Sequence, residues 1–249
     1  MLSKMKAAFC LVATFLFSNK AIQADHGDFI FMYSDHEPYI IVTDNGLSGF
    51  LAKYVNQVTS DANITAHWSN IPWKKQLSTL RRNTPNICAV TLYKTAERET
   101  YLRFTAPVGK NGGFVLVSIQ NNTRLLGHDF FKTVAVDQNL VPILQAKTIY
   151  NRYIDGLVAD KGFPEVNSSF ARIARSRINS MRDYFIIADV RARAFIKKED
   201  IRDKLAIYDH YPDLRSDTNY YIACSMATDD LLFNRMNEAI KHRGLVVPD

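Results

Sequence analysis

Residues 87–107, ICAVTLYKTAERETYLRFTAP, contain the stretch that decides the fold. The run at 87–90 is short and apolar, which is typical of a buried strand. Thr95 then predicts the start of a helix. Its side chain can accept a hydrogen bond from a free backbone N–H, and Glu97 and Glu99 suit the positive end of the helix dipole. A strand that passes through a loop into a capped helix is the basic unit of an α/β layer.

The residues around this stretch continue the alternation. Apolar runs and apolar residues at helical spacing predict a series of strands and helices at 28–33, 48–59, 64–68, 73–80, 87–90 and 95–101. Pro72 suits the start of the helix at 73–80, because a first-turn position does not need a backbone N–H. The series predicts parallel strands covered by helices.

A longer apolar run at 113–119 leaves this unit, and a second series follows it. Strands are predicted at 133–136, 184–188, 205–208 and 220–224, and helices at 141–153, 168–178, 190–196 and 229–242. Two α/β series joined by extended runs indicate two lobes with hinge strands near 113–119 and 218–224. We assign residues 25–110 and 218–249 to lobe one and residues 111–217 to lobe two.

Composition excludes several classes of protein. The chain has 249 residues, of which 47% are hydrophobic and 22% charged, so it is not collagen, a coiled coil, a long disordered chain or a multi-span membrane protein. Its net charge of +6 falls to +3 (28 basic against 25 acidic residues) once residues 1–24 are left out. That charge, without a basic run interleaved with aromatics, predicts no nucleic-acid partner.

Residues 1–24 are predicted to be a secretory signal peptide. Lys4 and Lys6 form a basic start, and residues 7–17 form an uncharged run that is too short to span a bilayer. Cleavage is expected after Ala24, with Ala21 as the alternative. A buried N-terminal helix is the other interpretation of the same run. The mature chain is therefore expected to be soluble and exported.

Export leaves the state of two cysteines open. Cys88 and Cys224 remain in the mature chain, each inside a short apolar run. Oxidising compartments permit a disulfide. We nevertheless expect two buried thiols, because free cysteines often act as small hydrophobic residues.

Arg98 is the strongest candidate for binding chemistry. It lies in the first turn after Thr95, where free N–H groups and the helix dipole favour an anion, and its guanidinium can grip a carboxylate through two hydrogen bonds. The alternative is a surface arginine paired with Glu97 or Glu99.

Other catalytic and metal-binding patterns are missing from the sequence. It has no GxSxG, HExxH or P-loop, and no paired Cys/His cluster. We predict no metal site, no cofactor and no catalytic residue.

Five blocks in order give the chain a specific resemblance. They are Glu37-Pro38-Tyr39, Gly46 with Gly49-Phe50, Ile71-Pro72-Trp73, Thr95-Ala96-Glu97-Arg98 and Phe104-Thr105-Ala106-Pro107. Together they resemble the first lobe of periplasmic solute-binding proteins of the polar amino-acid type, which serve ABC importers. A looser match continues through 134–136, 186–189 and 221–223. The resemblance implies a type II periplasmic binding protein fold, with two Rossmann-like α/β lobes and a two-strand hinge. It also implies a periplasmic monomer that works with an inner-membrane ABC permease.

The resemblance also implies roles for single residues. It assigns the ligand carboxylate to Arg98 and the ligand ammonium to Asp189 on the opposing lobe, and it places Trp73 in the cleft. Asp189 could instead cap the following helix, and Trp73 could belong to the core. The implied topology also places Cys88 and Cys224 close together.

Four positions depart from the family pattern. Tyr93 stands where another hydroxyl residue is usual, and His36 replaces the stacking aromatic before Pro38. Asn139 stands in the place of a Gly-Thr pair, and Tyr33 in the place of an acidic residue. The expected ligand-binding residues are Arg98, Asp189, Trp73, His36, Tyr93, Thr91, Tyr39 and Asn139.

Three functions fit this resemblance. The first is a binding protein that captures a small amino acid or related carboxylate between its lobes for ABC-type uptake. The second is an enzyme on the same fold, similar to the cyclohexadienyl dehydratases, which would need a general acid in the cleft. The third is an orphan sensor without a transporter.

Overall fold

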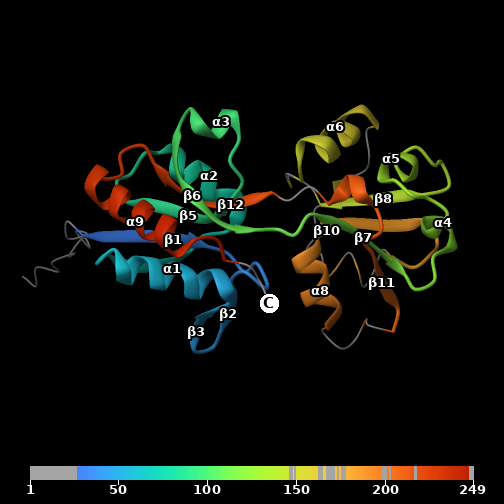
Figure 1. Ribbon diagram of the computed structural model, residues 1–249, viewed down its shortest axis with the longest axis horizontal. Helices are drawn as coiled ribbons and strands as arrows, with labels where there is room; N and C mark the ends of the chain where they lie inside the picture. Colours follow the sequence, from blue (N-terminus) through green and yellow to red (C-terminus); the bar gives the residue numbers. More distant parts are fainter. Residues whose placement is uncertain are drawn as a thin grey trace, which may run out of the picture.

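The computed structural model describes residues 27–145, 148, 150–161, 165–166, 172, 174, 178–197, 201, 203–215 and 218–246. The predicted signal peptide and most of the predicted helix at 168–178 lie outside them. The described chain forms two α/β lobes that lie end to end (Figure 1). We call the part built on the sheet of β1 lobe one, and the part built on the sheet of β7 lobe two.

Lobe one is a five-stranded sheet covered on both faces. The strand order is β4 (Thr65–Asn70), β1 (Asp28–Tyr33), β5 (Ile87–Leu92), β12 (Asn219–Ser225) and β6 (Leu102–Lys110). β1 runs parallel to β4 and β5, whereas β12 runs antiparallel to β5 and β6. The helices are α1 (Phe50–Asp61), α2 (Trp73–Arg81), α3 (Ala96–Glu99) and α9 (Asp230–Arg243), and a hairpin of β2 (Ile41–Thr43) and β3 (Gly46–Ser48) precedes α1.

Lobe two has a second five-stranded sheet. Its order is β11 (Leu205–Tyr208), β7 (Phe114–Ile119), β10 (Asp183–Ala188), β8 (Val141–Gln145) and β9 (Glu165–Val166). β8 runs parallel to β9 and β10, and β7 runs antiparallel to β10 and β11. Around it lie α4 (Thr123–Leu126), α5 (Phe131–Val134), α6 (Arg152–Lys161), α8 (Asp189–Lys197) and the 3-10 helix η2 (Pro212–Leu214).

The two sheets repeat one pattern. In lobe one the parallel strands lie in the order β4-β1-β5, and an antiparallel strand follows β5. In lobe two they lie in the order β9-β8-β10, and an antiparallel strand follows β10. In both sheets, therefore, the parallel strand that comes first in the chain lies between the second and the third. That antiparallel strand is β12 in lobe one and β7 in lobe two. Each of them is the strand by which the chain arrives from the other lobe, so the crossing segments meet beside the third parallel strand of both sheets.

The sequence predicted most of these elements, and two predictions were wrong. Residues 133–136, expected as a strand, lie at the end of α5 and beyond it. Residues 141–145, expected as the start of a helix, form β8. Short apolar runs fit either period, so tertiary partners decide between helix and strand. Here the backbone N–H groups of Phe131 and Lys132 donate to the Asp213 carboxylate, 2.8 and 3.0 Å away, which caps α5 from 80 residues along the chain.

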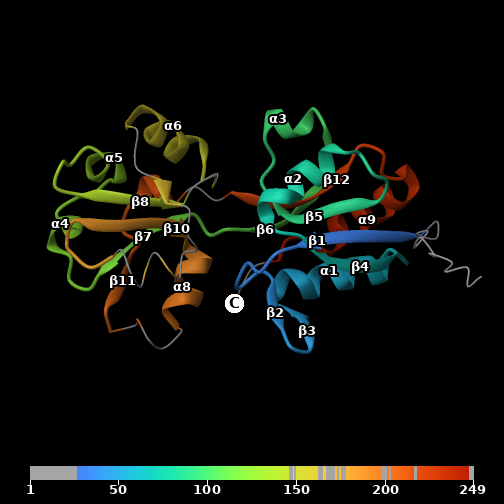
Figure 2. The same ribbon diagram turned by 180° about the vertical axis from the view of Figure 1, so that it is seen from behind.

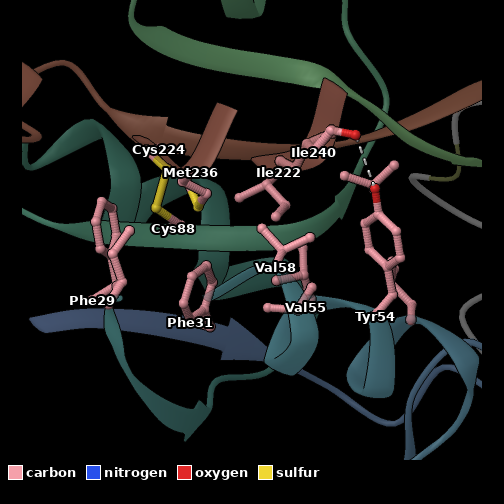
Figure 3. Packing of buried hydrophobic residues seen from close by; sticks show 14 of the residues in the cluster. Phe29, Phe31, Tyr54, Val55, Val58, Cys88, Ile222, Cys224, Met236 and Ile240 are labelled. Atoms are coloured by element: carbon pink, nitrogen blue, oxygen red, sulfur yellow. Dashed lines mark hydrogen bonds between the residues drawn. A yellow bond between two sulfur atoms is a disulfide. The ribbon is translucent and has the colours of Figure 1, made fainter. Parts of the chain in front are cut away.

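The two cysteines lie in the core of lobe one. Cys88 on β5 faces Cys224 on β12, and their sulfur atoms are bonded at 2.01 Å (Figure 3). Their predicted proximity is confirmed, and the expectation of free thiols was wrong. Because antiparallel register sets the two side chains directly opposite, nothing separates the sulfur atoms. Around them pack Phe31, Val58, Ile222 and Met236 from β1, α1, β12 and α9.

Candidate functional site

Asn111 ties together the two segments that cross between the lobes. Its side chain is fully buried, and its Oδ1 accepts hydrogen bonds from the backbone N–H groups of Gly113 and Thr218, each 3.0 Å away. Its own backbone N–H donates to the Thr218 carbonyl at 3.1 Å. Gly113 has a φ of +78° and lies against Arg215, where an added Cβ would come within 2.9 Å of the Arg215 backbone. The crossing is therefore closely packed.

Four aromatic side chains of lobe one gather beside this crossing. We call His36, Tyr39, Tyr93 and Tyr220 the aromatic cluster. The rings of Tyr93 and Tyr220 stack at 4.8 Å, those of His36 and Tyr39 at 5.2 Å, and Tyr39 meets Tyr220 edge-on at 4.7 Å. The Tyr93 hydroxyl donates to that of Tyr220 at 2.9 Å and accepts from the Asn111 amide at 3.3 Å. The cluster is thus linked directly to the crossing.

The cluster carries no charge of its own at neutral pH. Burial raises the phenol pKa of Tyr39, Tyr93 and Tyr220. Burial also holds the pKa of His36 well below its usual value, and the positive charge of Arg191 lowers it further. Three protonated phenols and a neutral imidazole therefore line this part of the lobe.

Arg98 lies in the first turn of α3, as the sequence predicted. Thr95 caps the helix by accepting from the Arg98 backbone N–H at 3.2 Å. The residue is 4% exposed, and its Nη1 donates to the Tyr93 carbonyl at 2.7 Å. Burial lowers the pKa of Arg98.

The neighbouring acidic residues are bound elsewhere. Glu97 pairs with Arg81 at 2.7 Å, and Glu99 pairs with Lys94 at 2.6 Å. Within the described part of the chain, no carboxylate lies at ion-pair distance from the Arg98 guanidinium. The alternative of a surface arginine paired with Glu97 or Glu99 was therefore wrong.

Asp189 is held by arginines of its own lobe. It begins α8 and is 7% exposed, and its backbone N–H donates to the Gly113 carbonyl at 3.0 Å. Its Oδ2 accepts from Nη1 of Arg215 at 3.0 Å, and its Oδ1 lies 2.7 Å from Nε of Arg193. The contact of Oδ1 with Arg193 is an ion pair whose geometry does not make a hydrogen bond, and Oδ1 is buried from solvent. Arg193 also binds Asp209 at 2.8 Å, so two carboxylates and two guanidinium groups balance.

Arg191 is a site residue that the sequence reasoning missed. It lies in the first turn of α8, and Figures 1 and 2 show this helix on the side of lobe two that faces lobe one. The preceding Val190 packs against the core of lobe one. The charge of Arg191 lowers the pKa of His36 and all three tyrosines of the aromatic cluster, and its buried Nε has no hydrogen-bond partner among the described residues. A basic residue two positions after Asp189 was the available signal.

The other predicted residues lie apart from this arrangement or at its edge. Trp73, the first residue of α2, packs against the core on its face of the sheet, and Thr91 is half-buried on β5. Asn139 precedes β8, is exposed, and accepts from Arg124 through its carbonyl. Because β8 and β10 are parallel, Asn139 stands at the opposite end of the sheet from Asp189. Its place beside the ligand was predicted from the wrong strand, and that prediction was wrong.

No helix among the described residues is long and apolar enough to cross a membrane. In the same residues, no group of three or more His, Cys, Asp or Glu side chains could hold a metal ion.

Comparisons with solved structures relate this geometry to known folds. The holo arginine-binding protein of T. maritima aligns with a TM-score of 0.67 at 17% identity, over 88% of this chain and 91% of that chain. A substrate-binding protein of an ABC uptake transporter from Streptococcus pneumoniae, solved with bound histidine, aligns with a TM-score of 0.65 at 19% identity, over 87% of each chain. The ancestral amino acid-binding protein AncCDT-1, described as a precursor of cyclohexadienyl dehydratase, aligns with a TM-score of 0.67 at 13% identity, over 87% and 89%. No curated protein is similar enough to count as a match.

These alignments confirm the predicted type II periplasmic binding protein fold. The family model described as bacterial extracellular solute-binding proteins, family 3, matches residues 30–243, which is most of both lobes. Fold, strand order and sequence pattern agree, and the chain belongs to family 3 of the bacterial extracellular solute-binding proteins.

Proposed function

We propose that this protein captures a small amino acid or related carboxylate between its two lobes. The observation that carries the proposal is Arg98, a residue 4% exposed in the first turn of a capped helix, whose guanidinium has no carboxylate partner among the described residues. A buried cation without an acid is costly unless a ligand supplies the charge. Relatives solved with arginine and histidine support the ligand class.

The proposal also covers the cellular location of the protein and its transport partner. Residues 1–24 direct export, the mature protein is a periplasmic monomer, and the loaded protein delivers its solute to an ABC permease. The extracellular family supports this location. Mass spectrometry of the exported protein should find Asp25 as its first residue.

We also propose which residues form each lobe and that the lobes close over the ligand. Residues 25–110 and 218–249 form the lobe that carries Arg98, and residues 111–217 close over it. Closure around a solute removes water, which strengthens a bidentate arginine–carboxylate contact.

Calorimetry tests the role of Arg98. The mature protein is titrated with amino acids and with small carboxylates, and the best binder is then titrated into Arg98→Ala and Arg98→Lys. Loss of one partner of a desolvated pair costs about 2–5 kcal/mol, and lysine restores only part of it because it lacks the planar fork. Arg81→Ala is the matched control, since this exposed arginine pairs with Glu97. Binding by Arg98→Ala within about threefold of wild type, under about 1 kcal/mol, contradicts the assignment.

The enzyme alternative has weaker support. A general acid works best when its pKa lies near the working pH. The phenols of the aromatic cluster have pKa values above their usual range, and His36 is held neutral. Recovery of an unchanged ligand after prolonged incubation is the expected result, and turnover would favour a dehydratase-like enzyme.

A further inference from the structure

The charges at the junction of the lobes point to a narrower ligand class. We infer that the site takes a small carboxylate anion that carries no ammonium group. The inference rests on the proposed function, because it concerns the ligand of the same site. It is argued from Asp189, from Arg191 and from the groups around the aromatic cluster.

The carboxylate of Asp189 is already neutralised by two arginines and is not available to bind an ammonium group. Its oxygens are occupied by Arg193 and Arg215, at 2.7 and 3.0 Å, and the carboxylate is 7% exposed. Its Oδ1, the oxygen outside hydrogen-bond alignment, is covered. An ammonium would have to displace an arginine that already neutralises this carboxylate, and a displaced or unpaired charge in a closed cleft is costly.

Arg191 places a positive charge of lobe two beside the aromatic cluster, where Asp189, already neutralised by its arginines, also lies near Tyr39. Arg191 follows Asp189 by two positions in the first turn of α8, next to Val190, which packs on lobe one. No described carboxylate lies at ion-pair distance from its guanidinium, and its Nε is buried without a partner. Arg98 in lobe one and Arg191 in lobe two are thus two guanidinium groups without a carboxylate partner among the described residues.

Among the described residues, no other acidic group around the cluster supplies the missing negative charge. Asp35 is exposed to solvent, and Glu37 already has an interaction partner. The phenols and the imidazole of the cluster are neutral, so they offer hydrogen bonds without a negative charge. The site therefore complements a carboxylate and leaves an ammonium unpaired.

The test compares acids that differ only in the ammonium group. Calorimetry on the mature protein uses the pairs succinate and L-aspartate, glutarate and L-glutamate, and 3-phenylpropionate and L-phenylalanine. We expect the acid without the amine to bind at least about tenfold more tightly in the best pair, which corresponds to about 1.4 kcal/mol. Arg191→Gln should weaken that acid about tenfold or more, whereas Arg182→Gln, an exposed arginine of the same lobe, should leave it unchanged.

Arg215→Gln provides the opposite perturbation. Removing this partner leaves the Oδ2 of Asp189 with only the longer hydrogen bond from Nη2 of Arg193, at 3.4 Å, so the preference should shift towards the amino acid of the pair. Because the ligand pairs are first compared on the wild-type protein, the inference can be tested even if a variant misfolds.

The possible failures are distinct. If every pair binds the amino acid as tightly or more tightly, the inference is wrong and the proposed capture of a small solute stands. If all six acids fail to bind but another amino acid binds in the wider titration, the inference is wrong and the proposed function stands. If no amino acid or small carboxylate binds, both are wrong. If the preference is found but Arg191→Gln leaves it unchanged, the assignment to Arg191 is overturned.

Discussion

The two lobes share one strand order and use their buried charges in opposite ways. In lobe one, a locally capped helix after the third parallel strand presents Arg98, which has no carboxylate partner among the residues that the structure describes. In lobe two, the helix after the third parallel strand begins with Asp189, which two arginines neutralise. The same topological position thus presents an unpaired charge in one lobe and a neutralised charge in the other. A fold match alone therefore does not transfer a binding role between positions.

The lobes also differ in what fixes their cores. Lobe one has a disulfide between its third parallel strand and the strand that returns from lobe two. At the corresponding place in lobe two, β10 and β7 are joined by their backbone ladder and by side chains such as Leu116 and Ile186. Lobe one should therefore depend on oxidation in a way that lobe two does not.

Loss of the disulfide should have the largest effect. Cys88→Ala with Cys224→Ala, or reduction under unfolding conditions, should lower the free energy of unfolding by about 2–5 kcal/mol, because the bond closes a loop of 136 residues in the unfolded chain. Both tryptophans, Trp68 and Trp73, lie in lobe one, so their fluorescence reports its unfolding selectively. The double variant, which has no bond to reduce, should not respond to reductant. Equal wild-type midpoints with and without reductant would contradict the prediction.

Loss of Asn111 should have the next largest effect and should reach the ligand. Asn111→Ala leaves the backbone N–H groups of Gly113 and Thr218 without their acceptor, at about 1–3 kcal/mol for each buried group left unsatisfied. It also removes the donor to Tyr93. We expect a lower melting temperature in a thermal scan and weaker ligand binding in calorimetry.

Asn122 supplies the matched control within lobe two. It is equally buried, donates to Ser118 and Met181, and caps α4 by accepting from Arg124. Asn122→Ala should lower the melting temperature comparably without changing the ligand affinity of the folded protein. If both variants change affinity to the same extent, Asn111 has no special connection to the site.

Local signals in the sequence were the ones that predicted structure well. Thr95 and its helix, the strand at 28–33 and the strand at 205–208 depend on neighbours within a few residues, and all are present. At the end of the chain the helix was also predicted, and the side chain of Asp229 caps it. These features form where local propensity and tertiary structure agree.

Features that depend on distant partners could not be predicted from one sequence. β6 is a strand because β12 pairs with it from more than a hundred residues away. Asp189 looked available because Arg215, one of the two arginines that neutralise it, follows 26 residues later. The ligand role of Asn139 failed because β8 had been predicted as a helix, which moved the end of the first strand. Only the fold brings these groups together.

The smallest predicted effect compares a local cap with a distant one. Thr95→Ala removes the hydroxyl that accepts from the Arg98 N–H, and Asp213→Ala removes the carboxylate that accepts from Phe131 and Lys132. Each should cost about 1 kcal/mol, the usual value of a helix cap. Because Thr95 also positions the turn that carries Arg98, Thr95→Ala should weaken carboxylate binding, whereas Asp213→Ala should not. Denaturant unfolding gives the two stabilities and calorimetry gives the two affinities. Asp213 also accepts from Tyr153, so Tyr153→Phe measures that bond separately. If Thr95→Ala is destabilised as expected but binds the ligand like wild type, the cap supports the helix alone, and the link from capped turn to ligand in lobe one is broken.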